Sequence, residues 1–233
     1  VGDSASMVMY GYDTTIPVTM DEMLFVTSAV SRGVKNALVV ADMPFMSYQT
    51  SIEKALENAG TFIKKAGASA IKLEGGKEMS DTISSIVNIG IPVMAHIGLT
   101  PQSFHQMSGY KIQGKSLETA EKILSDAYAV EKAGAFSLVL EGIPSELAEK
   151  ITNSISIPTI GIGAGPCCDG QIQVFHDILG LFDSFIPKHA KQFVNISETI
   201  SNAISSYKDD VENENFPSEK NYISIDKKIV EKL

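Results

Sequence analysis

Short apolar runs alternate with longer amphipathic segments along most of this chain. The runs are continuous and rich in β-branched residues, which favours strands buried on both faces of a parallel sheet. Val1–Gly2 has the pattern of the tail of a further strand. The other runs are Ala37–Ala41, Ala70–Leu73, Ile91–Ala95, Phe136–Leu140, Ile157–Ile162 and Ser184–Ile186.

Segments with helical spacing lie between these runs. Thr19 and Thr50 precede two of them, where N-cap residues are expected, and Gly67 and Gly134 follow two others, where helix C-caps favour glycine. The predicted helices are Met20–Ser31, Ser51–Ala66, Lys77–Ile89, Leu117–Ala133, Ser145–Ser154 and Ala190–Tyr207.

Repeated strand–helix units predict parallel strands joined by right-handed crossovers. The chain shows seven strand signals, whereas a closed barrel has eight. We therefore predict an α/β fold, a (β/α)8 TIM-type barrel whose N-terminal helix and first strand are absent from this chain. An open doubly wound sheet is the alternative. It is disfavoured because a helical segment follows every strand and no dinucleotide fingerprint follows the first, while the glycine-rich segment 161–165 comes late.

Composition narrows the classes of function. The 233 residues are 44% hydrophobic and carry a net charge of −9, which supports a sizeable core and argues against a nucleic-acid partner. No apolar stretch approaches the ~18 residues of a membrane-spanning helix. Cys167 and Cys168 are adjacent, so we expect a reducing, cytoplasmic location and assign them no role. We place the catalytic domain at 1–208 and a polar C-terminal extension at 209–233.

Ionisable residues follow five of the apolar runs. They are Asp3, Asp42, Glu74, His96 and Glu141. Because the carboxyl ends of barrel strands face one shared cavity, four carboxylates and one imidazole are expected to converge there.

Each of these residues also has a plainer interpretation. An aspartate after a strand is often a helix cap or a turn former, and a histidine in an apolar strand is often a core residue. Four carboxylates in one partly dry pocket, however, repel each other and require a cation. Oxygen ligands suit Mg²⁺ or a similar ion. Lys72 shares a strand face with Glu74, so its ammonium group could offset charge and hold an anionic substrate.

At these residues the sequence resembles the ketopantoate hydroxymethyltransferase family. The matching motifs run in order over nearly the whole chain, to about Tyr207. They are Val1–Ser4, Ala41–Met46, Lys72–Gly76, His96–Ser103, Gly109–Gly114, Leu140–Pro144, Gly161–Gly165, Asp169–Gln171 and Ile186–Lys188.

The resemblance implies a (β/α)8 barrel that assembles as a homodecamer, uses Mg²⁺ and has an N-terminal helix, a first strand and a helix before the Val1 motif. It implies transfer of a hydroxymethyl group from 5,10-methylenetetrahydrofolate to 3-methyl-2-oxobutanoate in pantothenate biosynthesis. The implied metal ligands are Asp3, Asp42 and Glu74, and the implied proton acceptor is Glu141. The implied substrate contacts are Asp3, Ser4, Asp42 and Lys72, to which we add His96.

The residues themselves suggest metal-assisted enolate formation. A divalent cation would acidify the C–H beside the ketone of a 2-oxo acid, and Glu141 is the candidate base because the other carboxylates are assigned to the metal. Lys72 would hold the substrate carboxylate. Two alternatives remain: another Mg-dependent 2-oxo acid aldolase or lyase, and a truncated barrel without activity.

Overall fold

The computed structural model describes the whole chain except residues 108, 110 and 183–185. The chain divides into two compact units, Val1–Val174 and Phe175–Leu233. Our predicted boundary between residues 208 and 209 stays a prediction. Within the described part of the chain, no helix combines the length and apolar character needed to cross a membrane.

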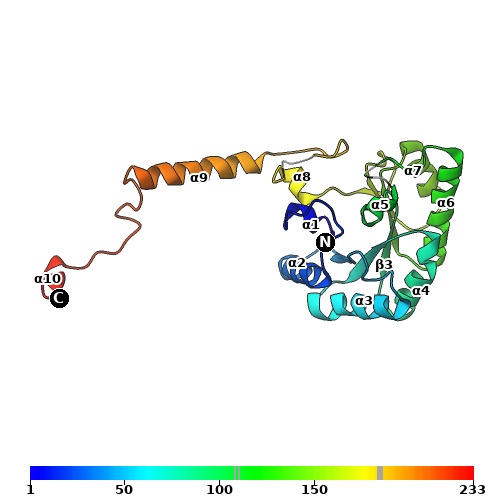
Figure 1. Ribbon diagram of the computed structural model, residues 1–233, viewed down its shortest axis with the longest axis horizontal. Coiled ribbons are helices and arrows are strands. Elements are labelled where there is room, and N and C mark those ends of the chain that lie inside the picture. Colours follow the sequence, from blue (N-terminus) through cyan, green and yellow to red (C-terminus); the bar gives the residue numbers. More distant parts are fainter. Residues whose placement is uncertain (108, 110, 183–185) are drawn as a thin grey trace. The chain divides into compact units, whose positions relative to one another are not determined.

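The first unit is built on a parallel sheet of six strands in the order β1 to β6. Helices follow one another around the outer side of this sheet (Figure 1), and α2, α3, α4 and α6 pack against its strands. The strands are β1 Val40–Asp42, β2 Ala70–Glu74, β3 Val93–Gly98, β4 Ser137–Glu141, β5 Thr159–Ile162 and β6 Gly170–Gln171. The fold is therefore α/β, and neighbouring strands follow one another in the chain. Closure into a barrel of eight strands stays a prediction.

Local sequence explains where the helices of this unit begin and end. The α2 N-cap Thr19 forms a capping box with Glu22, and α3 ends at Gly67, whose φ of 69° suits glycine. The α3 cap is Ser51 rather than Thr50, because the Ser51 hydroxyl accepts from the Lys54 N–H. The helices are α1 Ala5–Val8, α2 Met20–Gly33, α3 Ile52–Ala66, η1 Lys77–Met79, α4 Ser80–Asn88, η2 Pro101–Ser103, α5 Phe104–Met107, α6 Leu117–Lys132 and α7 Ser145–Thr152.

The core lies between the sheet and these helices. Apolar side chains of β2, β4, α3 and α4 belong to one buried cluster, and all of the following are fully buried: Phe62, Ile71, Leu73, Ile83, Ile86, Leu138 and Leu140. This packing confirms the prediction of strands covered on both faces. A rigid sheet of this kind fixes the positions of side chains at its carboxyl edge.

The predicted strands and the strands of the structure do not match one to one at three places. Val1 is not in a named strand, yet its N–H donates to the Val40 carbonyl and its carbonyl accepts from the Asp42 N–H, so it extends the ladder beside β1. The short strand β6 was not predicted. The predicted strand at Ser184–Ile186 falls mainly on residues outside the described part of the chain.

The second unit contains α8 Phe175–Leu179, α9 Ile196–Glu212 and α10 Lys227–Val230. The helix predicted at Ala190–Tyr207 begins six residues later, because Asn195 caps α9 by accepting from the Glu198 N–H. It also continues past Tyr207 to Glu212.

Candidate active site

Parallel pairing aligns the predicted ionisable residues at the carboxyl edge of the sheet. Asp42, Glu74 and Glu141 are the last residues of their strands, and His96 lies within β3. Side chains at matched register positions of parallel strands point to the same side of the sheet. The register pairs Asp42 with Lys72, Glu74 with His96, and Gly98 with Glu141.

Asp3 joins this group from the segment that runs beside β1. Its backbone N–H donates to Asp42 Oδ2 at 3.1 Å, and both aspartates are buried. Ser4 follows as the N-cap residue of α1, half-buried, and its side chain makes no capping hydrogen bond. The structure thus brings Asp3 to the site and leaves Ser4 at its margin.

Lys72 provides the positive charge of the cluster. Its Nζ lies 2.8 Å from Asp42 Oδ1 and 3.8 Å from Glu74 Oε1. Burial disfavours the charged form of Lys72, but attraction to Asp42, Glu74 and Asp3 outweighs burial and raises the pKa of Lys72. The side chain is therefore a permanent cation between two carboxylates.

This single ammonium group does not neutralise the carboxylates around it. Burial, reinforced by repulsion from Asp42, raises the pKa of Asp3 to about 7. Burial also raises the pKa of Glu74 well above its usual range, although Lys72 opposes the shift. Both side chains would be stabilised as anions by any further cation at the site.

His96 lies between two of the carboxylates. Its Nε2 is 3.2 Å from Glu141 Oε2, and its Nδ1 is 3.7 Å from Glu74 Oε1. Neither ring nitrogen completes a hydrogen bond within the described residues, because the Glu141 contact is close but poorly angled. Burial, with the nearby Lys72 charge, lowers the pKa of His96, so the ring is neutral at pH 7.

Two neutral residues complete the site, and sequence patterns did not reveal them. Gln102, in η2, donates from Nε2 to Asp3 Oδ2 at 3.0 Å and from its backbone N–H to Glu74 Oε2 at 3.0 Å. Tyr48 places its hydroxyl 2.7 Å from Gln102 Oε1 and accepts from the Glu74 N–H at 3.1 Å. Tyr48 lies in the loop after β1 and Gln102 in the short 3-10 helix after β3, where polar residues are common and carry no periodic signal.

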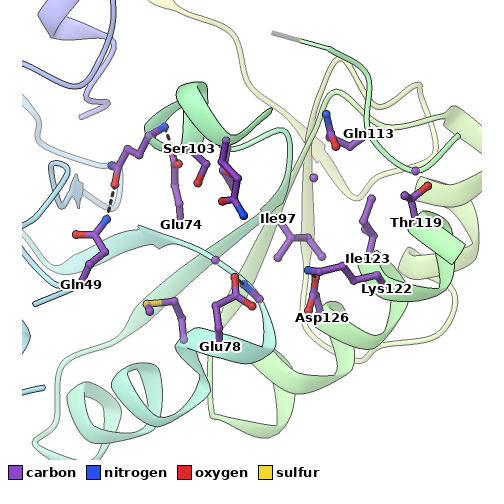
Figure 2. Close-up of a pocket in the computed structure, with 18 of the residues that line it drawn as sticks. Gln49, Glu74, Glu78, Ile97, Ser103, Gln113, Thr119, Lys122, Ile123 and Asp126 are labelled. Carbon is purple, nitrogen blue, oxygen red and sulfur yellow. Dashed lines mark hydrogen bonds and ion pairs between the residues drawn. The ribbon is translucent and has the colours of Figure 1, made fainter. Parts of the chain in front are cut away.

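A cavity of about 690 Å³ adjoins this cluster (Figure 2). Glu74, Tyr48 and Gln102 belong to its wall, so it reaches the acidic cluster directly. Its volume is within the range of small-molecule sites. Polar side chains line much of the remainder, including Gln49, Gln113, Glu78, Thr119, Lys122 and Asp126.

Similarity to known proteins identifies the family. A family model described as ketopantoate hydroxymethyltransferase matches residues 1–219. The 3-methyl-2-oxobutanoate hydroxymethyltransferase of Clostridium beijerinckii is 54% identical over 233 residues, which is all of this chain and 85% of the relative. The enzyme of the same name from Geobacter metallireducens is 58% identical over 219 residues, or 94% of this chain and 82% of the relative.

The chain belongs to the ketopantoate hydroxymethyltransferase family. It is therefore a transferase with a role in pantothenate biosynthesis. The predicted resemblance is confirmed over the whole chain.

Solved structures support the fold of this ketopantoate hydroxymethyltransferase family member. Phosphonopyruvate hydrolase, solved in complex with oxalate and Mg²⁺, superposes with a TM-score of 0.55 at 14% identity. The match covers 99% of this chain and 80% of that one. At this identity the likeness concerns the course of the backbone.

The carboxylate oxygens are the type of ligand that a hard cation prefers, although, as far as the chain is described, their present positions do not form a metal-binding geometry. Glu74 Oε1 is buried and has no hydrogen-bond partner among the described residues. Asp3, Asp42 and Glu74 offer oxygen ligands only, which Mg²⁺ prefers. In the part of the chain that the structure describes, no group of three or more His, Cys, Asp or Glu side chains already converges in metal-binding geometry. The donor set therefore fits a divalent cation that would draw the ligands together.

Proposed function

We propose that this protein transfers a hydroxymethyl group from 5,10-methylenetetrahydrofolate to 3-methyl-2-oxobutanoate, giving 2-dehydropantoate (ketopantoate). The observation that carries the proposal is the placement of Lys72 against Asp42 and Glu74, with Glu141 across His96, in a chain 54–58% identical to relatives with this name. The cavity beside Glu74 offers room for small-molecule substrates.

Asp3, Asp42 and Glu74 are the proposed ligands of Mg²⁺ or another divalent cation. When bound, such a cation polarises the ketone of the substrate and makes the neighbouring C–H more acidic. The raised pKa values of Asp3 and Glu74 and the unpartnered Glu74 Oε1 support this assignment. Because ligands must be deprotonated, metal affinity should rise with pH.

The substrate is an anion, and Lys72 is the cation proposed to hold its carboxylate. The ammonium group remains charged at any physiological pH because the surrounding carboxylates raise the pKa of Lys72. A metal ion shared by Asp42 and Glu74 would release Lys72 from part of its attraction to them. Asp3, Ser4, Asp42 and His96 are the other proposed contacts of the substrate.

Glu141 is the proposed general base. Its side chain is 15% exposed, more than those of Asp42 and Glu74, so a substrate can reach it. It would take the proton from the third carbon of 3-methyl-2-oxobutanoate, and the resulting carbanion would attack the one-carbon unit of the folate. One carbon–carbon bond forms, both carbon–nitrogen bonds of the folate methylene bridge break, and water supplies the hydroxyl group. The proton taken from the third carbon and one proton of the water end on the two folate nitrogens. Neutral His96, whose Nε2 lies 3.2 Å from Glu141 Oε2, would limit the movement of this carboxylate.

Finer features of the molecule belong to the same proposal. We place the six-stranded sheet within a (β/α)8 barrel, supported by its sequential parallel order and by the Val1 contacts beyond β1. A homodecamer and a cytoplasmic location complete it.

Product formation tests the proposal directly. Metal-free protein should form no 2-dehydropantoate from the two substrates, and added Mg²⁺ should restore turnover. Cleavage or condensation of a 2-oxo acid without folate would favour a metal-dependent aldolase or lyase instead. Normal turnover after complete demetallation would refute the metal assignment, and inertness under every condition would indicate a barrel without activity.

A further inference from the structure

Gln102 is a neutral residue that donates hydrogen bonds to two carboxylates of the acidic cluster. Its side-chain Nε2 donates to Asp3 Oδ2 at 3.0 Å and to the Met43 carbonyl at 2.9 Å. Its backbone N–H donates to Glu74 Oε2 at 3.0 Å. The residue is 4% exposed, so these contacts are shielded from water.

The orientation of the Gln102 amide is fixed by its surroundings. Nε2 faces a carboxylate and a carbonyl, which only accept hydrogen bonds, whereas Oε1 faces the Tyr48 hydroxyl at 2.7 Å and Gln49 Nε2 at 3.2 Å. A flipped amide would oppose acceptor to acceptor at Asp3 and Met43. The side chain is thus locked in one position.

The contacts of Gln102 divide the oxygens of two carboxylates. Asp3 Oδ2 and Glu74 Oε2 are held by Gln102, whereas Glu74 Oε1 is buried without a hydrogen-bond partner in the described structure. Each carboxylate therefore has one anchored oxygen and one that Gln102 leaves available. The two hydrogen bonds restrict rotation of the carboxylates and leave one oxygen of each for a ligand.

The Tyr48 hydroxyl holds the amide oxygen of Gln102. The residue is 1% exposed, and its hydroxyl accepts from the Glu74 N–H while lying within hydrogen-bond distance of Gln102 Oε1. One hydroxyl thus ties the strand end that carries Glu74 to the side chain that holds Asp3. Outer-shell groups of this kind orient the ligands of metal sites.

We infer that Gln102, supported by Tyr48, is a positioning residue that sets the direction in which Asp3 and Glu74 present to a divalent cation the oxygens that Gln102 does not hold. The inference rests on the proposed function for the presence of the cation. It assigns to Gln102 no contact with the reacting atoms.

Isosteric variants test this role. Gln102→Met keeps the length of the side chain and removes the amide, and Tyr48→Phe keeps the ring and removes the hydroxyl. We expect Gln102→Met to weaken Mn²⁺ binding about 10–100-fold, and Tyr48→Phe to weaken it less, because the amide still reaches Asp3. Calorimetry would give the Mn²⁺ affinity, and steady-state kinetics would separate kcat from the KM for 3-methyl-2-oxobutanoate.

Asn58→Leu is the matched control. Asn58 is a buried amide that donates to the Ser47 carbonyl at 2.6 Å, next to Tyr48, and this side-chain hydrogen bond does not involve the carboxylates of the site. It should lower the melting temperature without changing Mn²⁺ affinity. If Asn58→Leu and Gln102→Met lose Mn²⁺ affinity equally, the loss reflects a less stable loop and not the contacts of Gln102. This result would overturn the inference.

The outcomes separate this inference from the proposed function. Wild-type affinity for Mn²⁺ in a folded Gln102→Met, with wild-type kcat and KM, overturns the inference alone. If Gln102→Met does not fold, wild-type affinity in Tyr48→Phe has the same consequence. Failure of the unmodified protein to bind Mn²⁺ refutes the proposed metal site, and the inference with it.

Discussion

The Lys72 ammonium group interacts with three carboxylates at the carboxyl edge of this sheet, those of Asp3, Asp42 and Glu74, and this imbalance of charge governs the behaviour of the individual residues. Burial raises the pKa values of Asp3 and Glu74, and Lys72, which lies closest to Asp42, opposes these shifts only in part. Glu141 stands apart, against neutral His96. The separation into a charged cluster and an outlying carboxylate suggests distinct roles for them.

The role of Glu141 as base can be isolated from the folate step. In heavy water, enzyme, metal and 3-methyl-2-oxobutanoate should exchange the proton on the third carbon of the substrate. Glu141→Gln cannot accept this proton and should slow the exchange by at least ~10²-fold. Mn²⁺ binding should survive, because Asp3, Asp42 and Glu74 remain. NMR follows the exchange and calorimetry the metal.

Glu146→Gln controls for the loss of charge, since Glu146 is exposed in the first turn of the following helix, α7. It should exchange the substrate proton at the wild-type rate. Exchange at the wild-type rate in Glu141→Gln would exclude Glu141 as the base and make His96 the next candidate.

Asp3 should impose a pH dependence on the stability of the metal-free protein. Its pKa is about 7 in the folded protein against an ordinary 3.8, so the folded state binds the proton more tightly. The free energy of unfolding should therefore fall as pH rises from about 4 to about 7, at up to ~1.4 kcal/mol per pH unit for this one group. Asp3→Asn cannot ionise and should lack this component.

Urea unfolding in the presence of a chelator, from pH 5 to pH 8, measures the difference. Asp3→Asn should gain stability relative to the wild-type protein as pH rises. Parallel curves for the two proteins would show that Asp3 does not titrate in this range. Addition of Mg²⁺ at pH 8 should stabilise the wild-type protein more than the variant.

Ionisable residues of the site were predictable, and neutral ones were not. A charged side chain directly after an apolar run stands out, which is why Asp42, Glu74 and Glu141 could be found from sequence. Their mutual distances depend on packing, so the pairing of Lys72 with Asp42 could not. Gln102 and Tyr48 act through three-dimensional contacts of ordinary loop residues, for which a single sequence has no signal.

At the scale of elements, the end of β3 constrains Glu141, the proposed base. Gly98 has φ of 96°, and a Cβ there would lie 2.3 Å from the Glu141 carbonyl oxygen. Gly98→Ala should therefore push β4 away at Glu141, costing about 1–3 kcal/mol of stability and lowering kcat. Thermal unfolding and turnover measure the two effects.

Gly60→Ala provides the matched control in α3. No atom lies within 4 Å of the added Cβ, and alanine is the better helix former, so this variant should be ~0.5–1 kcal/mol more stable with unchanged kcat. A Gly98→Ala protein as stable and active as wild type would mean that β3 and β4 are not tightly coupled at this edge.

Long elements were predictable from the sequence, and short or irregular ones were not. The five long apolar runs became β1 to β5, and α2, α3, α6 and α7 begin or end within two residues of their predicted positions. The predicted helix Lys77–Ile89 opens with a 3-10 turn, η1. Two residues suffice for β6 because β5 supplies the hydrogen-bonding edge, and no periodic pattern marks so short a strand.

For the whole molecule, the family resemblance predicted more properties than the hydrophobic patterns did. Strand–helix alternation predicted an α/β fold with parallel strands, which the sheet confirms. Alternation alone does not determine whether such a sheet closes, because closure depends on strand tilt and stagger. Family membership, in contrast, rests on motifs spread over the chain, and the comparisons bear it out.

Exposed apolar side chains on α9 make the predicted assembly testable. Four large side chains recur at spacings of four, three and four residues and so form a stripe on one side of this helix. Within their own unit they are 44–63% exposed. The stripe consists of Ile200, Ile204, Tyr207 and Val211.

An apolar stripe of this kind favours association, and the proposed homo-oligomer supplies a second copy of the chain as its partner. We therefore expect sedimentation to give a species well above the 25.0 kDa of one chain. Ile204→Glu should shift the distribution toward smaller species, because it places a charge in the stripe. Ser206→Glu, about 200° around the helix from Ile204, should not. A wild-type protein that sediments as a monomer would contradict the oligomer, and equal behaviour of both variants would exclude α9 from its interface.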